Sequence, residues 1–158
     1  MEDLRELIQD LIQINNDRIE GYNKAAELLP KDHNEDLHSN FARFRNQSQD
    51  FVRELEPFIE MEGETATTST MVSGKLFRMW MGIKTSITGH DRLSVLESCE
   101  RGEDAFKKAY TEALQDADEI PVALLNTIRH QSEEQYMAHD YIKTVRDAAR
   151  QEPNELGL

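Results

Sequence analysis

The residues best suited to chemistry in this chain are carboxylate and amide side chains that recur at helical spacing. Glu20 and Glu103 each stand alone on a segment, whereas two other segments carry a glutamine followed three residues later by a carboxylate. These candidate ligands are Glu20, Gln47, Asp50, Glu103, Gln131 and Glu134, with His130 one helical turn before Glu134. Carboxylates and imidazoles hold metal ions such as manganese and iron. Carboxylates also pair with arginine through two parallel hydrogen bonds, so the residue types allow two chemistries.

Arginines accompany these polar residues, and the whole pattern occurs twice. Segment 17–26 aligns with segment 100–109 at an offset of 83 residues, and segment 45–50 aligns with 129–134 at an offset of 84. Two blocks in the same order at nearly the same offset predict a duplicated two-helix unit. The repeated polar residues are expected to form one layer near the middle of the molecule. That layer comprises Arg18, Glu20, Arg45, Gln47, Ser48, Arg101, Glu103, Arg129, Gln131 and Ser132.

Four long helices must position this layer. Apolar residues spaced three and four apart predict a first helix over about 3–29 and three further long helices. The second is expected to be capped by Asn34 and closed by Gly63, with Pro57 kinking it or ending its regular part. Asp91 is expected to cap the third, and Pro121 marks the start of the fourth.

The connections between the helices predict the topology. Two turns are short, whereas the middle connection is long and contains a short amphipathic helix expected over 71–88 and anchored by Trp80. We expect the second hairpin to run parallel to the first, as in an all-α, ferritin-like four-helix bundle with one long crossover. Residues 1–150 are expected to form one domain, followed by a disordered tail over 151–158.

Composition restricts the partners. The net charge of −13 argues against nucleic acid and against anionic membranes, because both require a basic surface. A single cysteine, Cys99, permits no internal disulfide and fits a reducing compartment. The chain shows no signal-peptide pattern and no apolar run of about 20 residues. These observations predict a cytoplasmic protein whose partners are a second copy of itself or another protein.

Three stretches carry a family resemblance. They are Ile14-Asn-Asn-Asp-Arg-Ile-Glu-Gly-Tyr22, Arg78-Met-Trp80 with Lys84, and Cys99-Glu-Arg-Gly-Glu-Asp104 with Tyr110. On these residues the chain resembles a bacterial family of ferritin-like four-helix bundles that is catalogued as a domain of unknown function, number 2383. The resemblance spans residues 4–147, nearly the whole chain. It implies the fold, and the family brings no established activity with it.

The ferritin-like fold raises a di-metal hypothesis. Di-metal members of such bundles use one glutamate on each of two helices and Glu-x-x-His on each of the other two. Glu20 and Glu103 match the single glutamates, but Gln47-x-x-Asp50 and Gln131-x-x-Glu134 replace the other two motifs. The alternative prediction is therefore a divergent di-iron or manganese protein that binds or oxidises metal.

The arginines favour a different interpretation. Four of them supply the positive charge that two metal ions would otherwise bring, and a buried carboxylate must be paired. The leading prediction is a metal-free, cofactor-free network of arginine, glutamate, glutamine and serine that fixes helix register. Cys99 and His139 are expected to be core or boundary residues, and Trp80 to pack the crossover on the bundle. The predicted function is a non-enzymatic accessory or stress-type protein that acts through protein contacts.

Overall fold

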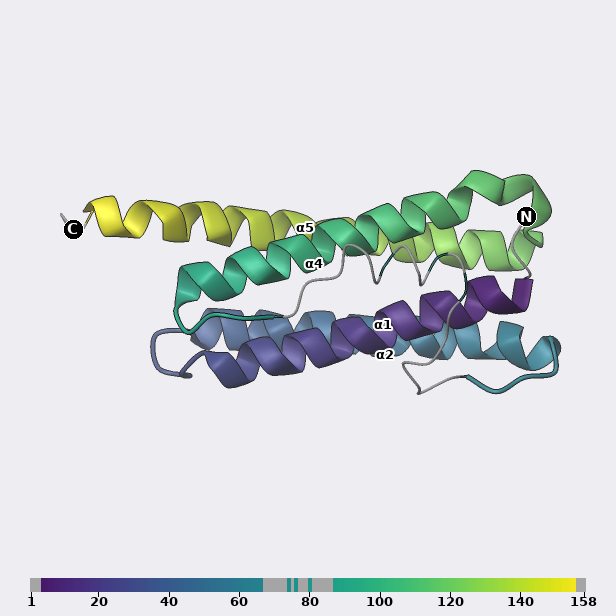
Figure 1. Ribbon diagram of the computed structural model, residues 1–158, viewed down its shortest axis with the longest axis horizontal. Helices are drawn as coiled ribbons and strands as arrows, with labels where there is room; N and C mark the ends of the chain where they lie inside the picture. The colour runs from purple at the N-terminus through teal and green to yellow at the C-terminus, as the bar shows by residue number, and fades with distance from the viewer. Residues whose placement is uncertain (1–3, 67–73, 75, 77–79, 81–86, 156–158) are drawn as a thin grey trace.

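The described part of the chain forms an all-α four-helix bundle (Figure 1). The computed structural model describes residues 4–66, 74, 76, 80 and 87–155. Its elements are α1 (Leu4–Leu28), α2 (Glu35–Met61), α4 (Arg92–Ala113), a 3-10 helix (Leu114–Glu119) and α5 (Val122–Glu155). Within these helices, none is long and apolar enough to cross a membrane.

The directions of the four helices give an up-down-down-up bundle. α1 and α2 form one antiparallel hairpin, and α4 and α5 form the other (Figure 1). α2 ends at one end of the bundle and α4 begins at the other, so α4 runs parallel to α2 and antiparallel to α1 (Figure 1). The second hairpin is thus reversed relative to the first, which corrects the expected parallel arrangement. One long crossover is the connectivity of ferritin-like bundles.

Of the two expected N-caps, Asp91 caps its helix and Asn34 does not. Asp91 caps α4 through a capping box, because its carboxylate accepts from the Ser94 backbone N–H at 2.8 Å and Ser94 bonds back to the Asp91 N–H. Asn34 occupies the N-cap position of α2 without a side-chain cap. Its amide instead donates to the Pro30 carbonyl at 2.9 Å, which holds the α1–α2 turn.

α2 ends close to its expected boundary at Gly63, whereas α5 runs further than the sequence predicts. α2 continues past Pro57 to Met61, and fully buried Ile59 anchors the part beyond the proline. α5 continues to Glu155, so residues 151–155 are helical where a disordered tail was expected. Arg150 of α5 pairs with Glu97 of α4 at 3.3 Å, and propagation from a docked turn extends a helix readily.

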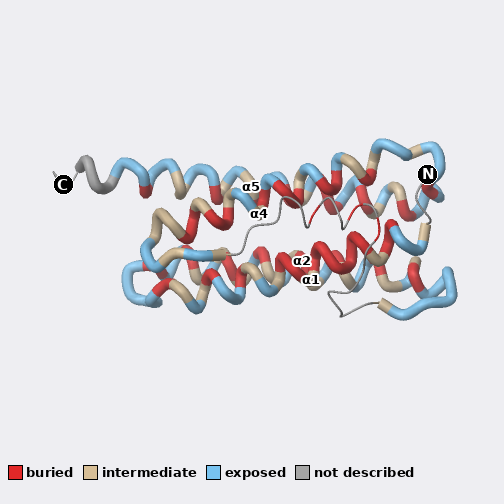
Figure 2. The backbone as a smooth tube through the Cα atoms, in the orientation of Figure 1, coloured by how far each residue is buried: buried red, intermediate tan, exposed pale blue. Residues whose placement is uncertain are grey.

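The core consists of two apolar clusters, one toward each end of the bundle. Figure 2 shows the buried residues along the facing sides of the helices. One cluster gathers around Phe51 and Phe106, and the other around Phe41 and Phe44. Several buried polar residues, among them Arg18, Ser48 and Glu103, lie at the level where these clusters meet. Most of the expected crossover helix over 71–88 lies outside the described residues.

Candidate functional site

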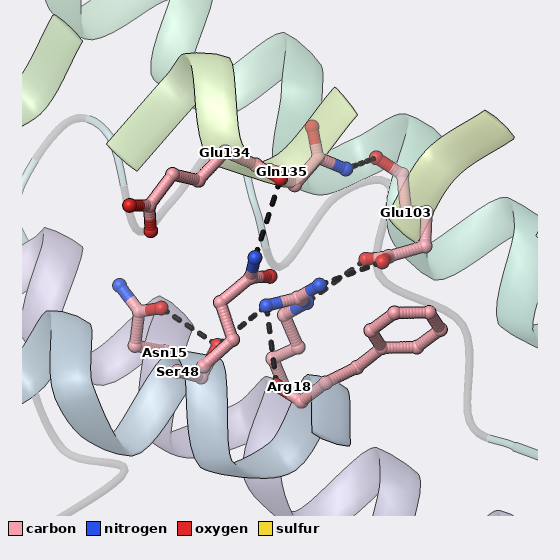
Figure 3. A network of polar contacts seen from close by, with 8 residues as sticks. Asn15, Arg18, Ser48, Glu103, Glu134 and Gln135 are labelled. Carbon is pink, nitrogen blue, oxygen red and sulfur yellow. Dashed lines mark hydrogen bonds and ion pairs between the residues drawn. The ribbon is translucent and has the colours of Figure 1, made fainter. Parts of the chain in front are cut away.

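A buried ion pair between α1 and α4 lies at the centre of the bundle (Figure 3). Arg18 Nε lies 2.9 Å from Glu103 Oε2, and Arg18 Nη2 lies 2.7 Å from Glu103 Oε1. The two side chains are only 3% and 2% exposed. A planar guanidinium donates in this bidentate way to a carboxylate, which fixes both orientation and spacing of the two helices.

The remaining contacts of Arg18 reach α2. Its Nη1 donates to Ser48 Oγ at 2.9 Å and to the Phe44 carbonyl at 3.4 Å. The guanidinium also lies over the Phe106 ring, with its carbon 4.8 Å from the ring centroid. All three nitrogens of the guanidinium therefore have acceptors, which is the condition under which a buried charge is tolerated.

A chain of hydrogen bonds continues from Ser48 through all four helices. Ser48 Oγ donates to Asn15 Oδ1 at 2.8 Å, and Asn15 Nδ2 donates to the Tyr110 hydroxyl at 2.8 Å. Tyr110 then donates to Gln131 Oε1 at 2.7 Å. Gln131 Nε2 donates to the Phe51 carbonyl at 3.1 Å and to the exposed carboxylate of Glu54 at 3.0 Å.

All the hydrogen bonds in this series donate in the same direction. The series begins at the guanidinium of Arg18 and ends at the carboxylate of Glu54, so each bond is polarised in the sense that strengthens the next. We refer to the residues Asn15, Arg18, Ser48, Glu54, Glu103, Tyr110 and Gln131 as the waist network. Its members come from α1, α2, α4 and α5.

Two further glutamines tie the helix backbones together at the same level. Gln135 Nε2 donates to the Glu103 carbonyl at 3.1 Å, and Gln47 Nε2 donates to the Glu134 carbonyl at 3.2 Å (Figure 3). These bonds join α5 to α4 and α2 to α5. A shift of any helix by one turn would break several of them, so the network specifies helix register.

Burial and charge set the protonation of the site. Burial acts to lower the pKa of Arg18, but the Glu103 carboxylate raises it, and the net pKa lies above the ordinary value. Burial raises the pKa of the Tyr110 phenol, although the hydrogen bond from Asn15 opposes this. Burial also raises the pKa of the Cys99 thiol, and the nearby Glu103 adds to the effect. Cys99 is therefore held as a thiol, the unreactive form.

A comparison with models of sequence families finds one family that matches this chain. The model described as "Domain of unknown function (DUF2383)" matches residues 3–116. The chain belongs to this family. No curated protein matches, and no solved structure matches. The match to DUF2383 covers α1, α2, the crossover and α4, so Arg18 and Glu103 lie inside it, whereas Gln131 and Gln135 of α5 lie beyond it.

In this DUF2383 chain, several residues expected in the polar layer lie outside the buried network. Glu20, Arg101 and Arg129 are exposed, and among the described residues Arg101 donates only to Ser98, at 3.2 Å. Half-buried Arg45 bonds to Asn23 and Asn46. The structure thus differs from the expected symmetric layer, because the rotation of each helix about its axis decides which of its side chains face the core.

The remaining layer residues are buried or half-buried. Ser132 is 8% exposed, whereas Ser48, its match in the predicted repeat, is fully buried. Gln131 is fully buried, and Gln47 is half-buried.

The candidate metal ligands do not converge. Exposed Asp50 pairs with Arg53 at 2.6 Å, and His130 pairs with Glu134 at 2.6 Å on the surface of α5. Glu103 is occupied by Arg18. Among the residues that the structure describes, no group of three or more histidine, cysteine, aspartate or glutamate side chains is placed to hold a metal ion.

The predicted polar layer left out several polar residues that the structure buries. They include Asn15, Gln135, Asp10 and Asp17, each at most 5% exposed. Asn15 and Asp17 stand between the buried apolar residues of α1, and such an interruption of an apolar face is the signal that could have identified them. Tyr110 entered the sequence analysis only through the family resemblance.

Asp10 and Asp17 face the crossover. Trp80 is 3% exposed, and its indole N–H donates to Asp17 Oδ2 at 2.9 Å. The carboxylate of Asp10 lies so close to the position of a Cβ atom on Gly74 that a larger residue there would require Asp10 to shift. Two buried carboxylates, seven residues apart on α1, therefore position the connection between the hairpins.

Proposed function

We propose that this protein is a non-enzymatic, metal-free bundle, located in the cytoplasm, that acts as an accessory or stress-type protein through contacts with other proteins. The observation that carries the proposal is the bidentate pairing of Glu103 by Arg18. Both oxygens of the most buried carboxylate at the waist are taken by a permanent cation. A di-metal centre needs those oxygens as bridging ligands.

The reactive side chains of the described residues also favour a non-enzymatic role. Cys99 is 3% exposed, and burial raises the pKa of its thiol. His139 Nε2 lies 2.6 Å from Asp104 Oδ1, which uses the nitrogen that would serve as a base. Nucleophilic catalysis requires a reactive nucleophile beside a base, and a buried thiol and an imidazole occupied by a carboxylate do not supply such a pair.

Protein contacts require apolar surface outside the core. The large apolar side chains that the described residues leave exposed are Met61, Val122, Tyr136 and Met137. Tyr136 and Met137 are neighbours on α5. Light scattering over a range of protein concentrations separates self-association from contact with another protein. A mass that rises to a defined oligomer in the wild type, and not in Tyr136→Ser/Met137→Ser, assigns the contact to a second copy.

Thermal melting with added metal tests the metal-free claim. We expect Fe²⁺ and Mn²⁺ to raise the melting temperature no more than Mg²⁺ does, because a ligand stabilises only a state that it binds. Mg²⁺ is the matched control for weak association with a chain of net charge −13. A larger rise with Fe²⁺ or Mn²⁺ that Glu20→Gln abolishes would instead establish the di-metal hypothesis.

A further inference from the structure

A cavity of about 300 Å³ lies between α1 and α4, beside the buried ion pair. Arg18, Tyr22 and Glu103 line it from the bundle side, and Trp80 and Ile87 line it from the connection. Its walls carry more apolar than polar surface. Ligand sites in proteins have this character, with mainly apolar walls and a few polar groups that converge.

Two glycines within helices keep this space open. Gly21 of α1 and Gly102 of α4 both line the cavity. A Cβ atom at Gly102 would meet nothing within 4 Å, and one at Gly21 would lie 3.6 Å from Ile87 Cγ1. Glycine weakens a helix relative to alanine, so it is retained inside a helix for a reason such as close approach. No described side chain approaches Gly102 closely, and the space above it belongs to the cavity.

The charged groups that line the cavity interior already have partners. Arg18 and Glu103 neutralise each other, and both oxygens of Asp17 accept hydrogen bonds, from Trp80 and, at 3.2 Å, from Gln13. The other two charged lining residues, Glu20 and Lys24, are exposed and opposite in sign. Pairing with a charged ligand would therefore disrupt one of these interactions, and burying a charged ligand without a pair is unfavourable. The cavity suits a neutral ligand.

One hydrogen-bond donor in the cavity wall is unused. Tyr22 is 5% exposed, and among the described residues no acceptor meets the geometry of a hydrogen bond with its buried hydroxyl. The Glu103 carboxylate lies nearby and interacts with this hydroxyl, but it is oriented by its two hydrogen bonds from Arg18. Burial, and then the Glu103 carboxylate, raise the pKa of the Tyr22 phenol well above its ordinary value, so the hydroxyl keeps its proton. A buried donor without an acceptor is destabilising, and an acceptor on a ligand would relieve this.

We propose that this cavity binds a neutral, largely apolar small molecule of about a dozen non-hydrogen atoms that presents one hydrogen-bond acceptor to the Tyr22 hydroxyl. The ligand lies between the glycine-bearing faces of α1 and α4, with Trp80 and Ile87 against it. This binding activity goes beyond the proposed function. It would make the position of the connection between the hairpins responsive to a small molecule.

Two probes of matched size test the proposal. Acetophenone and isopropylbenzene have the same number of non-hydrogen atoms, but only acetophenone has an acceptor. The chain has a single tryptophan, so the indole N–H of Trp80 gives one NMR signal at the cavity wall. We expect a saturable shift of this signal with both probes. Acetophenone should bind about fivefold more tightly, as one added neutral hydrogen bond predicts.

Two variants locate the binding. Tyr22→Phe should bring the affinities of the two probes within about twofold of each other by removing the donor. Tyr141→Phe is the matched control, because the Tyr141 hydroxyl accepts from Asn40 and Tyr141 does not line the cavity. Gly102→Leu should abolish the binding of both probes by filling the cavity, without lowering the melting temperature.

Each arm has an outcome that overturns the proposal. The absence of a saturable shift with either probe rules out the ligand site. An unchanged preference for acetophenone in Tyr22→Phe rules out the role of the hydroxyl. If folded Gly102→Leu binds the two probes with wild-type affinity, the probes bind outside this cavity. If Gly102→Leu does not fold, the comparison of Tyr22→Phe with Tyr141→Phe decides the matter.

Discussion

The two hairpins contribute unequally to the centre of the bundle. The first hairpin supplies Arg18 and the second supplies Glu103, and this pair is buried. The matching combination in the predicted repeat, Arg101 with Glu20, lies exposed and makes no ion pair among the described residues. This difference indicates that one buried ion pair, Arg18 with Glu103, is sufficient to fix the helices at the waist. A second pair would require two more charges to be removed from water, which is unfavourable even for well-matched ions.

Neutral groups replace the second pair. Asn15, Ser48, Tyr110 and Gln131 extend the hydrogen bonds of Arg18 across the bundle without additional charge. This network lies between the two apolar clusters and specifies which turn of each helix faces which. The layer is therefore polar but asymmetric in charge.

The largest expected effect comes from breaking the buried pair on one side. Arg18→Leu leaves Glu103 buried without its cation, which should lower the free energy of unfolding by about 3–5 kcal/mol. Arg101→Leu, at the matching exposed position, should change it by no more than about 0.5 kcal/mol. Urea denaturation of both variants measures the two values. Similar losses in both would show that the two halves are energetically equivalent.

The glutamines of the two halves should differ in the opposite direction, with the larger effect in the second hairpin. Gln131→Leu removes the acceptor of Tyr110 and the donor to Phe51, so it should lower the free energy of unfolding by about 2–3 kcal/mol. Gln47→Leu removes a single bond from a half-buried side chain and should lower it by less than about 1 kcal/mol. Equal effects in denaturant melts would contradict the asymmetry of the network.

The acidic residues before the two arginines offer a finer comparison. Asp17 accepts from Trp80 of the crossover, and the matching Glu100 binds Arg146 of α5 at 2.8 Å. Trp80→Phe keeps most of the packing but removes the buried donor, so it should lower the free energy of unfolding by about 1–2 kcal/mol. Arg146→Leu should lower it by about 1 kcal/mol or less, since this pair is partly solvated. A Trp80→Phe variant as stable as the wild type would show that the indole bond contributes nothing.

The smallest expected effect concerns the start of the second hairpin and depends on pH. The Ser94 backbone N–H lowers the pKa of Asp91 in the folded state, so the carboxylate stabilises α4 above the pKa of the unfolded chain. Asp91→Ala should lower the free energy of unfolding by about 1 kcal/mol at pH 7. This loss should shrink as the pH falls below about 4, through the lowered pKa of the folded state. A loss independent of pH between 7 and 3 would exclude the charge as its source.

Much of the fold was predictable from the sequence, because the spacing of apolar residues and the capping residues determine where each helix lies in the chain and which face it buries. The capping residue Asp91 and the burial of Phe41, Phe44, Phe51 and Leu55 follow from such patterns. The direction of the second hairpin was mispredicted, since it depends on where a long connection returns to the bundle. The ferritin-like assignment stays a prediction, as does the internal duplication.

The sequence predicts the height of the polar residues along the bundle, but it does not predict which of them bond to one another. The expected layer contains Arg18, Ser48, Glu103 and Gln131, and hydrogen bonds place these four residues at one level of the bundle. Which glutamate is buried depends on the rotation of each helix about its axis, and the repeat cannot specify that rotation. Asn15 was missed for a related reason, because its role requires Tyr110 on another helix.

The central claim is that a single Arg–Glu pair holds the waist, and a double-mutant cycle tests it most directly. The cycle compares Arg18→Met, Glu103→Gln and the double variant by urea denaturation, beside the same cycle on Arg101 and Glu20. We predict a coupling of about 2–3 kcal/mol for Arg18 with Glu103, and one below about 0.5 kcal/mol for Arg101 with Glu20. Equal couplings in the two cycles, or none between Arg18 and Glu103, would contradict the claim.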